Sequence, residues 1–392
     1  MVLRRLPRNI WAVSLTSFLM DISSEMVLNL IPLFLANVLG VGGTVIGAIE
    51  GVAESVASLL RVFSGYISDR LRRRKWLAVL GYGISALAKP FFYLAGSWWH
   101  VALARWADRV GKGIRTAPRD ALVADSIDPG NRGLAFGLHR AADTAGAFLG
   151  ILGALSAVYF TQGASPLLQA GTFRTIVLIS LVPAVLAVLS LAFLAREPRP
   201  KGSSPGPALR FSGLGRPFLL FLLLVGLFEL GNSADAFLAL RAQTLGANVL
   251  GILGMLAVFN LVYSLVSTPA GALSDRIPRK TLIVAGWFFY ALVYFAIGFA
   301  RQSWHMWVLY GAYGLYYGVA YGTARALIAD IVPVELRGTA YGAYATVVGL
   351  MAFPASLLAG VLWDAFGPSA PFFLGGSLAL IASGGLLLWR TR

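Results

Sequence analysis

The sequence predicts an all-α membrane protein of twelve transmembrane helices in two pseudo-symmetric six-helix bundles. Three observations support this fold class. Of the 392 residues, 58% are hydrophobic and only 12% are charged, whereas soluble domains carry about a quarter charged residues. The apolar residues form runs of about 20, the length that crosses a bilayer as a helix. Motifs of the first half recur in the second half at a nearly constant spacing, as a duplicated bundle requires.

Turn residues and charges divide the apolar runs into twelve expected spans. They cover residues 10–37, 44–67, 76–96, 98–125, 132–160, 172–195, 217–243, 248–271, 281–300, 304–329, 339–363 and 370–390. The stretch 196–216 is rich in proline, glycine and cations, so it cannot cross a bilayer. We therefore expect an N-terminal bundle at 1–195, a cytoplasmic linker at 196–216 and a C-terminal bundle at 217–392.

The formal net charge of +15 would suggest nucleic-acid binding in a soluble protein. Here the cations gather in alternate loops between the spans, for example at 70–75 and 276–280. Positively charged loops stay in the cytoplasm, so both termini are expected there, in a multi-pass protein of the cytoplasmic (inner) membrane. The first apolar run lacks a small-residue cleavage site and continues past Asp21 and Glu25, which predicts an uncleaved first span.

Internal repetition is the strongest signal of organisation. Residues 65–74 (GYISDRLRRR) align with 271–280 (GALSDRIPRK), an offset of 206 from 65 to 271. Residues 121–125 (ALVAD) match 326–330 (ALIAD), and 132–137 (RGLAFG) match 337–342 (RGTAYG), each at an offset of 205. Separate blocks that share nearly one offset indicate that one half of the chain was duplicated.

The loop after the second span carries Gly65, Asp69, Arg70 and Arg73. It resembles the Gly-x-x-x-Asp-Arg-x-x-Arg-Arg-Lys signature of major facilitator superfamily transporters. The resemblance covers essentially the whole chain and includes some likeness to proton-coupled drug exporters. It implies that two bundles rock about a site near the membrane midplane.

Two further segments carry that resemblance with departures. Residues 105–113 resemble the family pattern Arg-x-x-Gln-Gly-x-Gly-x-Gly, with Asp108 at the glutamine and Arg109 at the first glycine. In the fifth span the antiporter signature keeps its glycines at 146, 150 and 153, but Ile151 stands where the signature has proline.

Many ionisable residues lie inside the expected spans, where each costs about 2.5–3.5 kcal/mol on insertion scales unless it pairs or faces water. The candidates for substrate binding or proton coupling are Asp21, Glu25, Glu50, Glu54, Arg105, Asp108, Arg109, Lys112, Arg115, His139, Arg140 and Asp143 in the first half, and Glu229, Asn232, Asp235 and Arg325 in the second. Because ionised groups cannot face lipid, we expect them to converge on a shared interior crevice.

The fourth span places a stripe of cations at spacings of three and four, on one helix face. A positive excess in that stripe would favour an anionic substrate. If the cations are fully paired instead, the remaining acids, first of all Asp21 and Glu25, suit proton coupling. His139 and Asp143 lie one turn apart, either as a proton relay or as a packing pair. The sequence leaves these alternatives open.

The signature loop and its repeat predict a gate. The candidates are Gly65, Asp69, Arg70, Arg73, Asp275 and Arg276. We expect Asp69 to meet the N-terminus of the eleventh span near Gly338, and Asp275 that of the fifth near Arg132, since helix N-termini attract negative charge. These contacts would join the cytoplasmic ends of the bundles only when the protein faces outward.

The sequence contains no cysteine and none of the motifs typical of zinc proteases, P-loop nucleotide binding or serine hydrolases. An intramembrane enzyme is therefore disfavoured, and a receptor that binds without translocating is a further alternative. We expect a monomeric secondary transporter with no cofactor, metal or nucleic-acid partner. The first hypothesis is proton-coupled efflux of an amphipathic organic compound, and the main alternative is uptake or exchange of an anionic metabolite.

Overall fold

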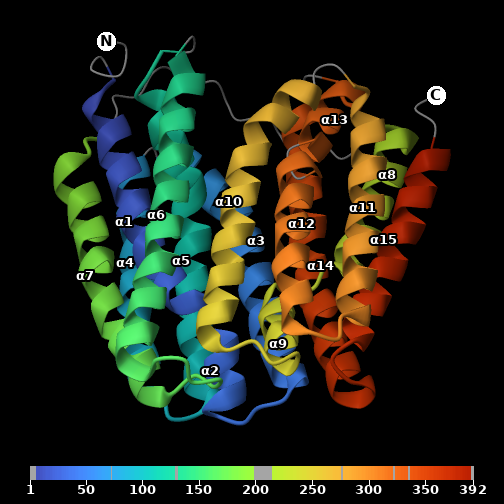
Figure 1. Cartoon of the computed structure of the whole chain (residues 1–392). Helices are drawn as coiled ribbons and strands as arrows, with labels where there is room; N and C mark the ends of the chain where they lie inside the picture. Colours follow the sequence, from blue (N-terminus) through green and yellow to red (C-terminus); the bar gives the residue numbers. More distant parts are fainter. Residues whose placement is uncertain are drawn as a thin grey trace. The chain divides into compact units, whose positions relative to one another are not determined.

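The computed structural model describes residues 6–71, 73–128, 131–197, 214–274, 277–320, 323–333 and 336–389. The described residues form helices and connecting turns, with no strand among them (Figure 1). The helices are α1 (Arg8–Leu28), α2 (Ile31–Asn37), α3 (Gly43–Leu71), α4 (Arg74–Tyr93), α5 (Trp98–Asp125), α6 (Arg132–Gln162), α7 (Ala170–Leu194), α8 (Gly215–Gly231), α9 (Ala236–Thr244), α10 (Val249–Ser274), α11 (Arg279–Phe299), α12 (Ser303–Ala320), α13 (Thr323–Ile331), α14 (Arg337–Phe366) and α15 (Ala370–Leu388).

Each of the twelve expected spans corresponds to one helix or to two consecutive helices. The first and seventh spans were expected to be continuous, but they are divided into α1 and α2, and into α8 and α9. The tenth span corresponds to α12 and α13, and residues 321–322 between them lie outside the described part of the chain. Pro32 lies in the first turn of α2, where proline is tolerated because that N–H has no partner inside the helix. The residues 232–235 between α8 and α9 include an Asn, a Ser and an Asp, whose side chains compete with the helix for backbone hydrogen bonds.

The chain divides into two compact units. The first unit comprises Met1–Gly40 and Val56–Gly206, and the second comprises Val41–Ser55 and Pro207–Arg392. Helix α3 belongs to both, because its first turns pack in the second unit and its later turns in the first.

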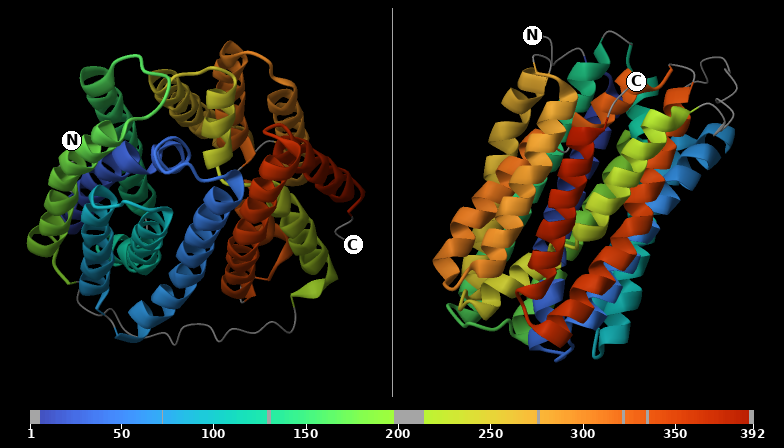
Figure 2. Two further views of the ribbon diagram at one scale, coloured as in Figure 1. Left: turned by 90° about the horizontal axis from the view of Figure 1, so that it is seen from below. Right: turned by 90° about the vertical axis from the view of Figure 1, so that its right-hand side faces the viewer.

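The two units repeat the same helix pairs, which can be followed in Figure 2. In the first unit α1 packs on α6 and α7, and α4 packs on α5 and α7. In the second unit α8 packs on α14 and α15, and α11 packs on α12 and α15. These pairs are the equivalents of the first set at the repeat offset, so the duplicated sequence folds as a duplicated bundle.

Glycines allow several of these helix pairs to approach closely, as small residues do between membrane helices. A side chain at Gly150 of α6 would begin 2.6 Å from the carbonyl oxygen of Ile22 on α1. In the second unit a side chain at Gly314 of α12 would begin 2.6 Å from the carbonyl oxygen of Phe259 on α10. Both glycines therefore serve helix packing.

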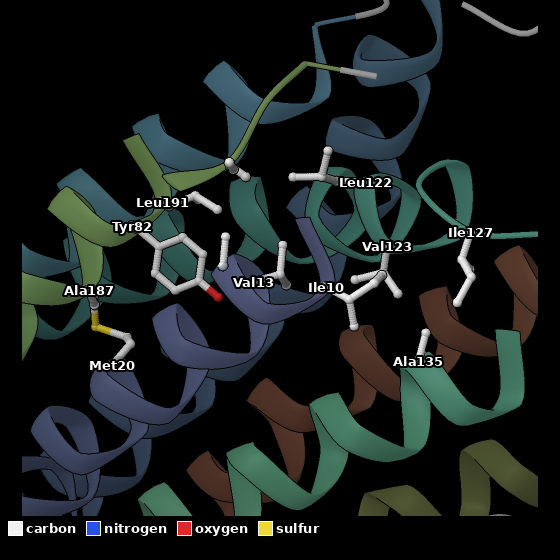
Figure 3. Close-up of a cluster of buried hydrophobic side chains, with 13 residues drawn as sticks. Ile10, Val13, Met20, Tyr82, Leu122, Val123, Ile127, Ala135, Ala187 and Leu191 are labelled. Carbon is white, nitrogen blue, oxygen red and sulfur yellow. The ribbon is translucent and has the colours of Figure 1, made fainter. Parts of the chain in front are cut away.

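The apolar core of the first unit joins α1, α4, α5, α6 and α7 (Figure 3). Val13, Tyr82, Leu122 and Leu191 are among its fully buried members. The Tyr82 hydroxyl lies 3.0 Å from the Ser17 hydroxyl on α1, so the large ring is buried without leaving its oxygen unpaired.

Eight helical segments of the described residues are long and apolar enough to cross a membrane. Helix α5 is not one of them, because charged residues recur along it every three or four positions. Such a helix can lie at membrane depth only where its charges are buried in protein or face water.

Candidate functional site

Two carboxylates lie one turn apart on α1 in the first unit. Asp21 is half-buried and lies within electrostatic reach of Asp143 on α6 and of Lys112 and Arg115 on α5. Glu25 accepts a hydrogen bond of 2.8 Å from the Asn29 amide. These acids and bases come from three different helices, so the structure brings together residues that the sequence could place only on separate faces.

The charged stripe of α5 is mostly buried inside the first unit. Arg105, Asp108, Arg109 and Arg115 are each at most 6% exposed, whereas Lys112 is exposed. A guanidinium nitrogen of Arg105 lies 3.9 Å from the Asp108 carboxylate. Charges buried to this degree are tolerated only when paired and hydrogen-bonded.

Arg115 joins the stripe to α4. Its guanidinium donates a 2.6 Å hydrogen bond to the Ser85 hydroxyl and lies over the Tyr82 ring, 4.5 Å from the centroid. One turn further along α4, Lys89 is only 1% exposed and lies within electrostatic reach of Asp108 and Asp21.

Towards the end of α5, Arg119 donates two hydrogen bonds to Asp120, of 3.0 and 2.8 Å. Arg61 of α3 lies 3.6 Å from the other oxygen of the same carboxylate. Asp120, which the sequence did not select, therefore neutralises part of the basic stripe.

His139 and Asp143 face each other on α6. The imidazole Nδ1 lies 3.7 Å from Asp143 Oδ1, and His139 is 4% exposed. Among the described residues, neither ring nitrogen has a hydrogen-bond partner. The imidazole and the carboxylate are therefore close to each other but not hydrogen-bonded. Arg140, the next residue, is exposed.

The remaining first-half candidates lie on α3. Glu50 is buried and Glu54 is half-buried, and both belong to the part of α3 that packs in the second unit. Gly65 packs against Ala117 of α5, at an ordinary 3.4 Å for an added side chain.

Three of the six predicted gate residues, Gly65, Arg70 and Arg73, lie within the described structure. Arg70 and Arg73 are exposed. The described part of the structure does not include the side chain of Asp69 or the residues Asp275 and Arg276. It also does not include the side chain of Arg325, a candidate for substrate binding or proton coupling.

The second unit has a polar cluster where α8 ends and α9 begins. The Asn232 amide donates to Glu229 at 3.0 Å, and the Tyr290 hydroxyl donates to the Asn232 carbonyl at 3.1 Å. Across the break, the Tyr313 hydroxyl donates to Asp235 Oδ1 at 2.7 Å. The sequence predicted Glu229, Asn232 and Asp235 together on a continuous helix; they lie instead at and beside a helix break.

Tyrosines from α11 and α12 surround this cluster, and the sequence reasoning missed them. Tyr290 and Tyr294 stack with ring centroids 4.1 Å apart, and Tyr290 meets Tyr316 edge-on at 4.9 Å. Their spacing of three and four residues along each helix was the signal that could have found them. No group of three or more metal-ligating side chains occurs in the described residues.

Comparison with known proteins decides the family. The family model of the Major Facilitator Superfamily matches residues 13–254 and 227–392. The chain belongs to this superfamily. It is therefore a multi-pass membrane transporter and not an enzyme, which confirms the fold class and the family predicted from the sequence.

Two relatives differ in how much of this chain they resemble. An MFS-type transporter of Methanocaldococcus jannaschii is 35% identical over 391 residues, covering 98% of this chain and 95% of that protein. The multidrug resistance protein MdtG of Proteus mirabilis is 32% identical over 129 residues, covering 33% of this chain and 32% of that protein.

Solved structures of superfamily members share the fold. The nucleoside transporter NupG superposes with a TM-score of 0.80 at 11% identity, covering 97% of this chain and 99% of that one. A D-xylose–proton symporter superposes with a TM-score of 0.75 at 15% identity, with 97% of each chain covered. At these identities the likeness concerns the fold alone.

Proposed function

We propose that this superfamily member exports an amphipathic organic compound across the cytoplasmic membrane in exchange for protons, by alternating access of its two bundles. The proposal places both termini in the cytoplasm, as the distribution of Lys and Arg among the loops indicates. The sequence has no nucleotide-binding motif, so uphill transport draws on an ion gradient.

The observation that carries the proposal is the group of carboxylates at membrane depth in the first unit. Asp21 lies within electrostatic reach of Glu25 and Asp143, and of the cations Lys112 and Arg115. Three neighbouring carboxylates repel one another when ionised, so taking up a proton relieves that repulsion. Movement of a cation towards or away from them changes their proton affinity, which is the coupling that an antiporter requires.

The contacts of α5 favour this role over the recognition of an anionic metabolite. Arg119 is held by Asp120, Arg115 by Ser85 and Tyr82, and Arg105 lies near Asp108. These guanidinium groups already contact partners of the same unit, which leaves them less available to bind an anionic substrate. The partial likeness to MdtG supports the direction and the kind of compound.

Transport into proteoliposomes tests the proposal. A pH gradient imposed across the vesicles should drive accumulation of one or more amphipathic dyes from a panel of cationic, neutral and anionic members. Asp21→Asn and Asp143→Asn should abolish dependence on the gradient. Asp128→Asn, an exposed carboxylate in the loop after α5, is the matched control and should transport normally.

Two outcomes would contradict the proposal. Accumulation of an anionic compound that ignores the pH gradient would support the anion carrier instead. Binding of a ligand that is never accumulated inside the vesicles would support a receptor.

A further inference from the structure

The two halves of the chain have diverged in chemistry at equivalent positions. At the offset of 205 that relates 132–137 to 337–342, the α5 residues Arg105, Asp108 and Lys112 correspond to Tyr310, Tyr313 and Tyr317 of α12. At the same offset, Lys89 of α4 corresponds to Tyr294 of α11. Four charged residues of one repeat are thus tyrosines in the other, and both pairs of helices, α4 with α5 and α11 with α12, are in contact.

Tyr313 and Tyr317 of α12 combine with Phe259 and Tyr263 of α10 into a connected set of rings, here called the aromatic quartet. Tyr313 and Tyr317 meet at 5.0 Å between centroids, and Phe259 lies 5.5 Å from each of them. Tyr263 is 6.2 Å from both Phe259 and Tyr317. Tyr313 is buried, whereas the other three rings are half-buried and keep part of their surface accessible.

Asp235 places a carboxylate beside these rings. It lies within a helical segment long and apolar enough to span the membrane, Gly215–Thr244, yet its side chain is exposed. Tyr313, the buried member of the quartet, donates the 2.7 Å hydrogen bond that orients it. An accessible carboxylate at membrane depth marks a functional site, since it would be costly against lipid.

Arg241, the cation of α9, makes its hydrogen bonds with the end of α11. Arg241 is buried and donates hydrogen bonds to the carbonyls of Gly298 and Ala300, at 3.1 and 2.8 Å. Its charge therefore serves the C-terminal end of α11, where carbonyl groups lack helical partners.

We infer that Asp235 and the aromatic quartet form the binding surface for an organic cation that carries flat rings. The face of a tyrosine attracts a cation within about 6 Å of its centroid, and a carboxylate adds a charge partner. The inference rests on the proposed function and narrows its substrate class from amphipathic compounds to amphipathic cations. In this arrangement the charged residues of the first unit bind and release the protons, and the second unit binds the organic cation.

Binding of radiolabelled tetraphenylphosphonium to the protein purified in detergent tests the inference. Wild type should bind this cation, and tetraphenylborate, which has the same shape and the opposite charge, should compete poorly. Asp235→Asn and Tyr317→Leu should each weaken binding by about tenfold or more. Tyr317→Phe keeps the ring and should stay within about twofold of wild type.

Two further variants separate recognition from folding. Tyr313→Phe keeps the buried ring but removes the hydroxyl that orients Asp235, so it should weaken cation binding without lowering the melting temperature as much as Tyr313→Ala. Asp330→Asn removes an exposed carboxylate of the same unit outside the site and should bind as wild type does.

The inference is overturned if wild type does not bind tetraphenylphosphonium, if tetraphenylborate binds equally well, or if Asp235→Asn binds as tightly as wild type. Binding in detergent needs no gradient. If the protein binds tetraphenylphosphonium as expected but its transport does not depend on the pH gradient, only the proposed function is contradicted. If the protein does not bind tetraphenylphosphonium but exports an uncharged compound in exchange for protons, only this inference is contradicted.

Discussion

Arg74 and Asp125 form an ion pair between the first turn of α4 and the end of α5, with Nε and Oδ2 2.6 Å apart. Exactly one repeat later, at an offset of 205, Arg279 and Asp330 are also 2.6 Å apart. The same tie between equivalent helices has thus survived in both units while the residues at membrane depth changed. This contact was preserved after the duplication, whereas Arg105, Asp108 and Lys112 became, or arose from, tyrosines.

These two pairs differ in exposure, and we expect them to differ in strength. The side chains are 21% and 37% exposed in the first pair and 29% and 51% in the second. Exposed pairs contribute about 0.2–1 kcal/mol and are screened by salt. Double-mutant cycles with Arg74→Gln and Asp125→Asn, and with Arg279→Gln and Asp330→Asn, should give the larger coupling for the first pair. A second pair that couples equally strongly in high salt would contradict this ranking.

Gly360 lies where α14 meets the start of α3, and a second prediction concerns this contact. A side chain at Gly360 would clash with the backbone carbonyl of Gly43 and begin 2.7 Å from the Thr44 Cα. Gly360→Ala should therefore lower the melting temperature, since overpacking costs about 1–3 kcal/mol. Gly342→Ala on the same helix meets nothing within 4 Å and should be neutral or stabilising, because alanine is the better helix former.

Asp364 holds the N-terminus of α3. Its two oxygens accept hydrogen bonds from the backbone N–H groups of Gly43 and Thr44, at 2.7 and 2.8 Å, and from the Thr44 hydroxyl at 2.6 Å. Asp364→Ala should cost about 1–2 kcal/mol, since it leaves N–H groups of the first helical turn without an acceptor. Asp364→Asn keeps one acceptor oxygen, so its melting temperature should lie between those of Asp364→Ala and wild type. Equal melting temperatures for all three proteins would show that the cap contributes nothing.

Much of the fold was predictable because membrane-spanning helices are recognised in a sequence by the length and apolar character of their residues. The internal repeat also means that a helix assigned in one half predicts an equivalent helix in the other. The breaks were not predictable in the same way. The apolar runs before and after residues 232–235 are nearly continuous in sequence, so the interruption depends on local competition for backbone hydrogen bonds. Asn232 and Asp235 were recognised as candidates, but their position at a break required the structure.

For the candidate site of the first unit, the sequence predicted which residues take part better than it predicted which of them are in contact. Helical spacing alone put Arg105, Asp108 and Arg115 on one face of α5. Tertiary packing determines which face of α4 contacts that stripe. Gly81 lies on this face, and a side chain at Gly81 would begin 2.6 Å from the Arg115 Cβ. The tyrosines of the second unit were missed because aromatic residues in apolar spans are ordinary packing residues in the absence of a visible polar partner.

Asp108 is the acid on which the buried cations of the first unit depend. It is 3% exposed and lies within electrostatic reach of Lys89, Arg105, Arg109 and Arg115. Removing the acid leaves these cations with one compensating charge fewer in a low-dielectric interior, which costs about 3–5 kcal/mol when a buried pair is broken. Asp108→Asn should therefore destabilise the protein more than Lys89→Met, because the latter removes only one of the several cations that surround Asp108.

The two substitutions should also compensate each other. Lys89→Met in the Asp108→Asn background removes one cation that has lost its partner, so the double variant should melt above the Asp108→Asn protein, or accumulate to a higher yield if that variant folds poorly. Asp120→Asn is the matched control: its carboxylate is 33% exposed, so its loss should cost less, and Lys89→Met should add to it without compensation. Additive effects in the Lys89–Asp108 pair would mean that the two charges do not share one network.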